Sequence, residues 1–215
     1  MTSNTEKTGL RGVWPALLTP LTPQLDIDHA LLAAHCRRLL DAGCAGVTLF
    51  GTTGEGPSFS FTERQQALQV LVDSGIAAAQ ILVSTSCAAL PETVELSRHA
   101  LNLGCPACLI LPPFFLKGVP DQGVVDAYRW IVEHVDDERL KIVLYHLPQV
   151  AGVGLSVGVI RALLDTYPDT IIGLKDSGCQ REDSVAFAQA FMPSLQVWVG
   201  NELDLQVMAA LGTKG

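Results

Sequence analysis

The sequence predicts an α/β fold of the (β/α)₈ type, the TIM barrel, with about seven of the eight β/α units. Apolar, strand-like runs recur about every 25 to 35 residues, and helical patterns lie between the first six of them. Strands that are apolar throughout and alternate with amphipathic helices are typical of a parallel sheet covered on its faces. The seven runs are residues 13–18, 46–50, 81–86, 107–111, 141–145, 170–175 and 196–200.

The first two predicted helices are marked by their ends. Asp28 can cap a helix that Gly43 ends, with an apolar stripe between them. Thr62 and Gln65 have the spacing of a capping box before a second apolar stripe. We therefore expect helices after the first two strands.

Three further helices are indicated in the same way. Pro91 suits a first helical position, and Gly104 suits the end of that helix. Ser156 can cap a helix that follows the fifth strand, and residues 204–211 begin a helix after the seventh.

Two parallel-sheet architectures fit this order of elements, a doubly wound open sheet and a barrel. No GxGxxG follows the first strand, which disfavours a nucleotide-binding open sheet. The polar, reactive side chains all follow strand ends, where a barrel has its catalytic face. The barrel is therefore favoured.

Composition and charge limit the organisation and the partners. The 215 residues are 48% hydrophobic, which fits a polar tail at 1–9 and one barrel domain over 10–215. The net charge is −8, with no basic patch, so nucleic acid and anionic membranes are poor partners. With no signal core and no apolar run of about 18 residues, a cytoplasmic location is expected.

The six cysteines do not follow a disulfide-scaffold spacing, so we expect reduced thiols. Cys105 and Cys108 form a CxxC pair, but it opens an apolar strand, and no second ligand pair stands at zinc spacing. We expect a structural pair, no metal site and no cofactor.

Lys175 is the first candidate catalytic residue. It ends the apolar run at 170–175, and burial there would disfavour its charged form. A neutral lysine amine can form a Schiff base with a carbonyl substrate, whereas a structural lysine would extend its amine to water.

Two other strand ends carry polar groups. Thr52, Thr53 and Gly54 follow the second strand, in a turn whose hydroxyls and N–H groups could hold a carboxylate. Tyr145 ends the fifth strand and could carry protons, or could be a core aromatic residue.

With these residues in place, the chain resembles the dihydrodipicolinate synthase / N-acetylneuraminate lyase family of pyruvate-dependent class I aldolases. Six segments carry the resemblance, in order: GVWPALLTP at 12–20, GTTGE at 51–55, LPPFF at 111–115, YHLP at 145–148, GLKDS at 173–177 and LGTKG at 211–215. They extend over essentially the whole chain after residue 9.

The resemblance implies a role for each candidate. Lys175 would form the Schiff base with pyruvate, and Tyr145 would shuttle protons. Thr53 and its neighbouring amides, Thr52 and Gly54 among them, would hold the pyruvate carboxylate, and Thr52 would hydrogen-bond Tyr145. The resemblance also implies a lyase without a cofactor, and a homo-oligomer, a dimer of dimers, in full-length form.

The chain departs from the lysine-pathway synthases at two places. Phe114 and Phe115 stand where those synthases have a relay tyrosine supplied across a subunit interface. Residues 149–152 lack the arginine that those synthases use for the carboxylate of the aldehyde. His146, in place of an asparagine, is interpreted as structural, with contact to substrate as the alternative.

The resemblance also implies an eighth strand and a C-terminal helical segment after residue 215, so we expect this sequence to be truncated. We expect a Schiff-base aldolase or lyase that acts on a 2-oxo sugar acid, or on pyruvate plus an aldehyde. The alternatives are 4-hydroxy-tetrahydrodipicolinate synthase and an inactive relative that binds a carboxylate.

Overall fold

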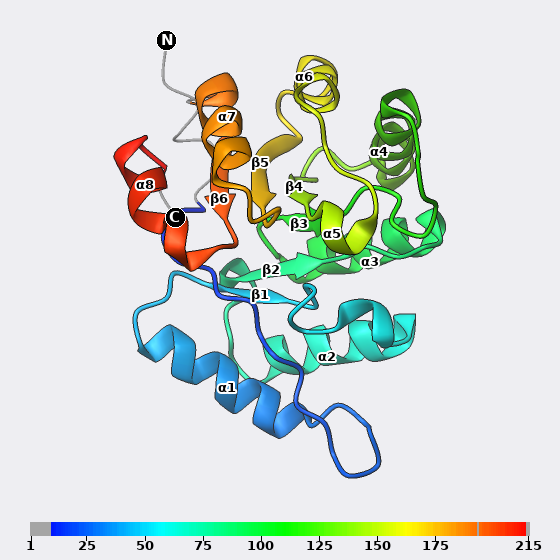
Figure 1. Cartoon of the computed structure of the whole chain (residues 1–215). Helices are drawn as coiled ribbons and strands as arrows, with labels where there is room; N and C mark the ends of the chain where they lie inside the picture. The colour runs from blue at the N-terminus through cyan, green and yellow to red at the C-terminus, as the bar shows by residue number, and fades with distance from the viewer. Residues whose placement is uncertain (1–9, 193, 214–215) are drawn as a thin grey trace. The chain divides into compact units, whose positions relative to one another are not determined.

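The computed structural model describes residues 10–192 and 194–213. They form two compact units, which we call the N-terminal unit (Gly12–Leu109) and the C-terminal unit (residues 110–192 and 194–213, with residues 10 and 11). Both are built from parallel strands joined by helices, as the sequence predicts (Figure 1).

The N-terminal unit is a short parallel sheet with helices packed on it. Strands β1 (Val47–Leu49) and β2 (Ile81–Ser84) pair in parallel, and β2 pairs with β3 (Cys108–Ile110), which ends at the unit boundary. Helix α1 contacts α2 and β1, and α2 contacts α3. Figure 1 shows α1 and α2 side by side along β1 and β2. The helices are α1 (His29–Asp41), α2 (Phe61–Asp73) and α3 (Leu90–Leu103), with short 3₁₀ turns η2 (Gly56–Ser58) and η3 (Ala78–Gln80).

The C-terminal unit repeats the same plan. Strands β4 (Ile142–His146), β5 (Ile171–Asp176) and β6 (Gln196–Val199) pair in parallel in chain order. Helix α4 contacts α6, and α7 contacts β6 and α8. The helices are α4 (Asp121–Val135), α5 (Pro148–Ala151), α6 (Val157–Thr166), α7 (Arg181–Phe191) and α8 (Leu205–Ala210), with the turn η4 (Glu202–Asp204) before α8.

The first predicted strand, residues 13–18, forms only an isolated parallel bridge, between Ala16 and Thr48. Thr48 N–H donates to Pro15 O at 2.8 Å, and Leu17 N–H donates to Thr48 O at 2.9 Å. Pro15 itself has no N–H to give to a sheet. The described residues therefore contain six strands, and residues 13–18 are extended chain beside β1.

Most of the predicted helix ends agree with the structure. Asp28 caps α1 by accepting from Leu31 N–H at 2.9 Å. Gly104 ends α3 in the left-handed conformation at φ +89°. Ser156 caps α6 by accepting from Val159 N–H at 3.1 Å.

The capping box of α2 was predicted at the wrong residues. It is formed by Ser60 and Glu63, two positions before Thr62 and Gln65. Ser60 N–H donates to Glu63 Oε2 at 2.8 Å, and Glu63 N–H donates to Ser60 Oγ at 3.3 Å. Both pairs fit the sequence pattern, but a carboxylate accepts stronger hydrogen bonds than the Gln65 amide would.

Helix α7 was not predicted. Its cap residue, Gln180, makes no capping hydrogen bond with its side chain, and the first turn, residues 181–183, is wholly charged. The buried face of α7 begins only after that turn, so the start of the helix carries no apolar pattern in the sequence. It consists of Ser184, Phe187, Ala188 and Phe191.

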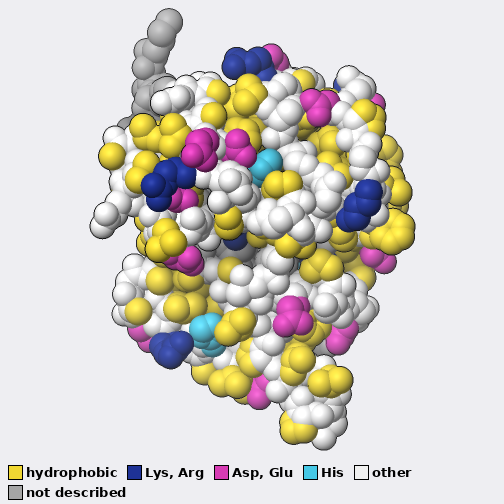
Figure 2. All heavy atoms as spheres, in the orientation of Figure 1, with side chains coloured by type: hydrophobic (Ala, Val, Ile, Leu, Met, Phe, Trp, Pro, Cys, Tyr) yellow, Lys and Arg dark blue, Asp and Glu magenta, His cyan; other side chains and the backbone are white. Residues whose placement is uncertain are grey.

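Within the described residues, no helix combines the length and apolar character needed to cross a membrane. On the face shown in Figure 2, lysine and arginine side chains are dispersed among acidic and hydrophobic ones.

Candidate active site

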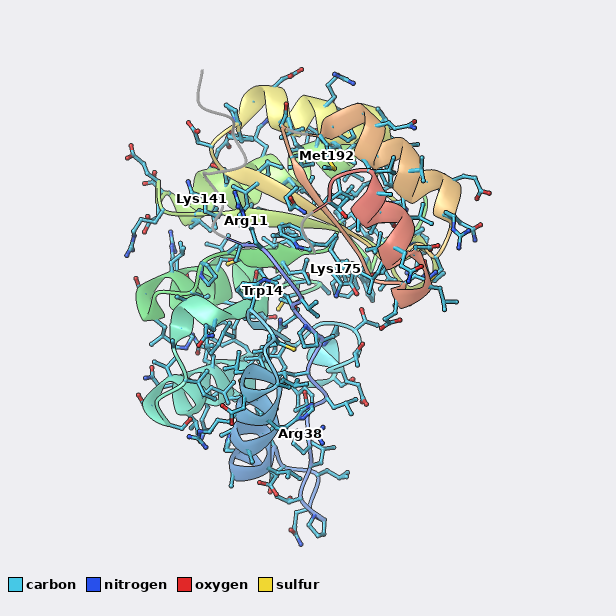
Figure 3. All side chains as sticks on the ribbon, turned by 90° about the vertical axis from the view of Figure 1, so that its left-hand side faces the viewer. Arg11, Trp14, Arg38, Lys141, Lys175 and Met192 are labelled. Carbon is cyan, nitrogen blue, oxygen red and sulfur yellow. The ribbon has the colours of Figure 1, made fainter. Side chains whose placement is uncertain are left out.

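Lys175 lies near the carboxyl end of β5, in a strand that is otherwise buried. Leu174 before it and Asp176 after it are almost inaccessible, whereas Lys175, which is labelled in Figure 3, is partly exposed. Alternation along the strand places Leu174 and Asp176 on the opposite face from Lys175. The amine therefore stands on a rigid element and can meet a small molecule from solvent.

Tyr145 is the partner of Lys175 across the β4–β5 pair. Their Cα atoms are in register, so both side chains stand on the same face of the sheet. Lys175 Nζ lies 4.8 Å from the centroid of the Tyr145 ring, which is a cation–π distance. Tyr145 is 3% exposed. Strand pairing thus brings together Lys175, predicted to form the Schiff base, and Tyr145, predicted to shuttle protons.

Trp198 extends this row to a third strand, and sequence reasoning missed it. Its Cα is in register with that of Lys175 across the β5–β6 pair. A Cβ at Gly173 would overlap the six-membered ring of Trp198, so the indole leans onto the β5 backbone two residues before Lys175. A glycine two positions before a candidate lysine, within a strand, was the available signal for a ring packed there.

The opposite face holds a buried polar cluster that fixes the end of β5. Asp176 accepts from Gly178 N–H at 2.9 Å and from the Ser184 hydroxyl at 2.5 Å. His146, in register with Asp176, accepts from Leu155 N–H through Nδ1 at 2.9 Å. Burial lowers the pKa of His146, and the nearby carboxylates of Asp176 and Asp183 oppose that effect. These contacts are those of a structural histidine.

The glycine–threonine loop lies after β1, in the N-terminal unit. Glu55 N–H donates to Thr52 O at 3.0 Å, which closes a tight turn. The Thr19 hydroxyl donates to Gly54 O at 2.6 Å. A Cβ at Gly54 would lie 2.7 Å from Leu17 O, so the loop requires glycine there. The turn holds Thr52 half-buried and Thr53 exposed.

The two sets of predicted site residues thus lie in different units. Lys175 and Tyr145 are set together within the C-terminal unit, and Thr52, Thr53 and Gly54 are set together within the N-terminal unit. The hydrogen bond expected between Thr52 and Tyr145 would join the units, and it stays a prediction.

Arg64 is a second residue that sequence reasoning missed. It extends from α2 to the end of β2, where its guanidinium donates to Ser84 O at 2.7 Å and to Ser86 O at 3.0 Å. It is 3% exposed, and burial lowers its pKa. The guanidinium thus bridges the carbonyl of the last β2 residue and a carbonyl two residues beyond it, so we assign Arg64 to the support of that strand end.

The residues that differ from the lysine-pathway pattern lie on the surface of the C-terminal unit. Phe115 is 73% exposed, and Val150, on α5, is 56% exposed. Lys117 ties their two segments together by donating to Phe114 O at 2.6 Å and to Ala151 O at 2.9 Å. Lys117 is therefore engaged with backbone carbonyls.

The two cysteines of the CxxC pair lie in a buried environment. Cys105 and Cys108 are buried, and burial raises the pKa of their thiols to about 12 and about 11. A thiol with such a pKa is a poor nucleophile and a poor metal ligand near neutral pH. Within the part of the chain that the structure describes, no cluster of His, Cys, Asp and Glu has the arrangement of a metal site.

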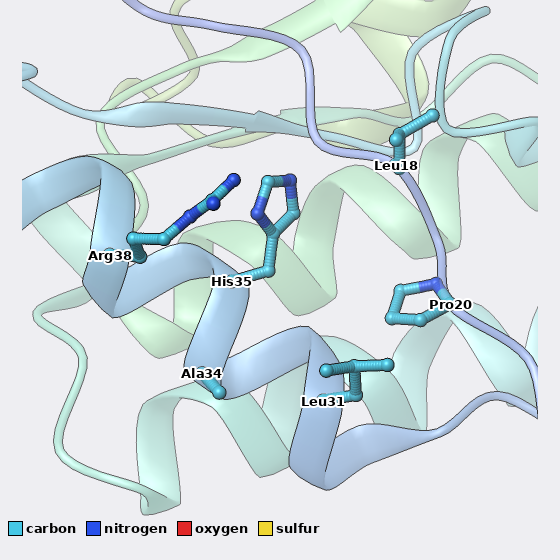
Figure 4. Close-up of a pocket in the computed structure, with 6 residues that line it drawn as sticks. All are labelled: Leu18, Pro20, Leu31, Ala34, His35 and Arg38. Carbon is cyan, nitrogen blue, oxygen red and sulfur yellow. The ribbon is translucent and has the colours of Figure 1, made fainter.

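A cavity of about 430 Å³ opens on the N-terminal unit, beside α1 (Figure 4). Its walls are mainly apolar, with His35 and Arg38 on one side, and its lining is Leu18, Pro20, Leu31, Ala34, His35 and Arg38. None of the predicted site residues lines it, so the cavity adds nothing to the candidate site.

Comparison with known proteins agrees with this geometry. Residues 9–215 match the model of the dihydrodipicolinate synthetase family. An uncharacterised DapA-like lyase of Chloroflexus aurantiacus is 34% identical over 206 residues, which are 95% of this chain and 68% of that protein. The 4-hydroxy-tetrahydrodipicolinate synthase of Rhizobium meliloti is 30% identical over 167 residues, 78% of this chain and 55% of that protein.

A solved structure gives the fold. Dihydrodipicolinate synthase from Agrobacterium tumefaciens superposes with a TM-score of 0.90 and 31% identity, over 94% of this chain and 71% of that one. The fold is accordingly of the TIM-barrel class, and the chain belongs to the dihydrodipicolinate synthetase family.

Proposed function

We propose that the protein is a class I lyase that forms a Schiff base between Lys175 and pyruvate or a related 2-oxo acid. The observation that carries the proposal is the register of Lys175 with Tyr145 at the carboxyl end of a parallel strand pair. In barrels of this class, side chains at strand carboxyl ends form the catalytic face. Membership of the family supplies the chemistry that such a pair would perform.

The proposed reaction begins with attack of the Lys175 amine on the keto carbon of the substrate. The carbinolamine that forms loses its hydroxyl as water, which leaves an iminium. The Tyr145 hydroxyl gives and takes the protons of these steps, because a phenol can act as acid and as base. No metal or organic cofactor is needed for this sequence.

The iminium then acts as an electron sink. Loss of a proton from the neighbouring methyl gives an enamine, whose carbon attacks an aldehyde and forms a carbon–carbon bond. In the reverse direction, the same bond breaks and releases the aldehyde. Thr53 and the amides around Thr52 and Gly54 are proposed to hold the carboxylate of the 2-oxo acid.

We infer that the second substrate is not aspartate semialdehyde. Phe115 and Val150 are apolar where the lysine-pathway synthases use a tyrosine and an arginine. A site built around a cation loses much of its affinity for a charged partner when that cation is missing. A 2-oxo sugar acid, or pyruvate with an uncharged aldehyde, fits better.

Two other functions are kept as alternatives. The Rhizobium meliloti and Agrobacterium tumefaciens relatives are synthases by name, which favours 4-hydroxy-tetrahydrodipicolinate synthase as the second candidate. The third is a relative that binds a carboxylate without turnover. The chain spans 68% and 55% of the two curated relatives described, so activity is proposed from the residues present.

A turnover screen tests the proposal. Purified protein would be assayed for pyruvate release from a panel of 2-oxo sugar acids, and for condensation of pyruvate with aldehydes that include aspartate semialdehyde. We expect turnover of the sugar acids and loss of all turnover in Lys175→Ala, because the nucleophile is removed. Lys141→Ala is the matched control, since that amine donates to Asp169 O at the other end of the strand pair.

Each other outcome selects an alternative. Preferred turnover of aspartate semialdehyde would favour the synthase. Binding of 2-oxo acids with no product from any pair would favour the inactive relative. Turnover that persists in a folded Lys175→Ala protein would remove Lys175 from the mechanism.

A further inference from the structure

The indole N–H of Trp198 is a polar group without a role in the chemistry described above. Nε1 is buried, and it has no hydrogen-bond partner among the described residues. Indole nitrogen is a donor only, and buried donors in folded proteins are almost always paired. An unpaired one beside a candidate catalytic lysine therefore calls for an acceptor from outside the described chain.

The position of the ring limits where that acceptor lies. Trp198 is in register with Lys175, so its side chain leaves β6 on the face that carries the amine and Tyr145. The atoms Cε3, Cζ3 and Cη2 are the ones that a Cβ at Gly173 would meet. The five-membered ring that carries Nε1 is on the other side of the indole, so the N–H edge is turned away from the Gly173 backbone.

Neighbouring strands lie about 4.8 Å apart, and both side chains are long. A molecule bound covalently to Lys175 Nζ is therefore within reach of the Trp198 ring. Its carbon chain beyond the imine would pass over an apolar surface with a single uncharged donor at one edge.

We propose that Trp198 Nε1–H donates a hydrogen bond to an oxygen of the substrate chain beyond the imine, and so selects hydroxylated 2-oxo acids. This inference rests on the proposed function, because it needs the substrate to be held at Lys175. A neutral donor suits a hydroxyl or carbonyl oxygen, whereas a second carboxylate would call for a cation. Trp198 thereby favours the sugar-acid class over aspartate semialdehyde.

The test compares Trp198→Phe with the unsubstituted protein. Phenylalanine keeps an aromatic ring at this position and removes the donor, together with the outer part of the indole that lies over Gly173. Borohydride trapping at Lys175 would be titrated with three acids: pyruvate, a six-carbon 3-deoxy-2-oxo sugar acid, and 2-oxohexanoate, which has the same chain length without hydroxyls. Trp130→Phe is the matched control, because that indole stacks on His134 on α4.

We expect Trp198→Phe to raise the sugar-acid concentration that gives half-maximal trapping about three- to tenfold, the usual effect of losing one hydrogen bond. Pyruvate and 2-oxohexanoate should titrate as before, and Trp130→Phe should change none of the three. Unchanged preference for the sugar acid in Trp198→Phe would overturn the inference. An equal loss for all three acids would also overturn it, since the ring would then serve packing alone. If the unsubstituted protein traps no acid at Lys175, the proposed function fails, and this inference fails with it.

Discussion

At the scale of the residue, the site depends on the alternation of side chains along β5, which places Lys175 on a different face of the sheet from its two neighbours. Leu174 and Asp176 face a packed interior, while Lys175 faces the side that Tyr145 and Trp198 share. Three residues in register across three paired strands carry the amine, a phenol and an indole on one face of the sheet. Such a row needs no loop to position it, which suits a covalent mechanism that requires tight geometry.

Tyr145→Phe tests the proton relay at this scale. The substitution keeps the ring beneath Lys175 Nζ and removes the hydroxyl. We expect the rate of imine formation with pyruvate to fall about 10²–10⁴-fold, as for loss of a positioned acid–base group, with the fold unchanged. Tyr167→Phe, outside the site, is the control. The measurement is the single-turnover rate of adduct that borohydride can trap, and an unchanged rate would remove Tyr145 from the relay.

His146 gives a prediction of pH dependence. Burial lowers its pKa in the folded protein below the ordinary 6.5, so the folded state resists protonation there. Stability is therefore complete above about pH 6.5 and falls as the pH drops below that value. His146→Asn keeps an acceptor for Leu155 N–H and removes the titration.

We expect the free energy of unfolding of His146→Asn to decline less between pH 7.5 and 5.5 than that of the unsubstituted protein. Denaturant titrations across that range measure the difference. Parallel curves for the two proteins would show that His146 does not carry the pH dependence.

At the scale of the element, helix ends were more predictable than strand ends. Asp28, Gly104 and Ser156 each act through local chemistry, and the structure confirms all three. The run at 13–18 is strand-like in its apolar pattern, yet only Ala16 forms a bridge. Strand formation depends on hydrogen-bonded pairing with neighbouring segments, and the local sequence of residues 13–18 does not determine that pairing.

The capping box of α2 is the element-level prediction. Ser60→Ala removes the side chain that accepts from Glu63 N–H and donates to its carboxylate. We expect a loss of about 1 kcal/mol in the free energy of unfolding, the usual cost of losing a cap. Ser58→Ala, exposed and in the preceding turn, is the control. Equal stability of the two variants would show that Ser60 does not cap α2.

At the scale of the whole molecule, the sequence predicted the fold class and the alternation of parallel strands with helices, but it did not predict helix α7 or that residues 13–18 form only a bridge. It did not predict Trp198 or Arg64, whose roles come from register and burial between segments far apart in the chain. Such roles arise from tertiary contacts, which a local pattern does not record. The single barrel domain expected over residues 10–215 stays a prediction.

A double-mutant cycle tests whether the two sets of site residues act together. If Thr52 and Tyr145 belong to one relay, Thr52→Val should slow imine formation less than Tyr145→Phe. Adding Thr52→Val to Tyr145→Phe should then cost little more, because residues that act as a unit are not additive. If the fold-loss in rate of the double mutant equals the product of the two single-mutant losses, the two hydroxyls work separately.

Covalent trapping tests the central claim most directly. The protein would be incubated with pyruvate, reduced with borohydride, digested and analysed by mass spectrometry. We predict one reduced pyruvate adduct, located on Lys175, which is absent without pyruvate and absent from Lys175→Ala. No adduct, or an adduct on another lysine such as Lys141 in place of Lys175, would contradict the account.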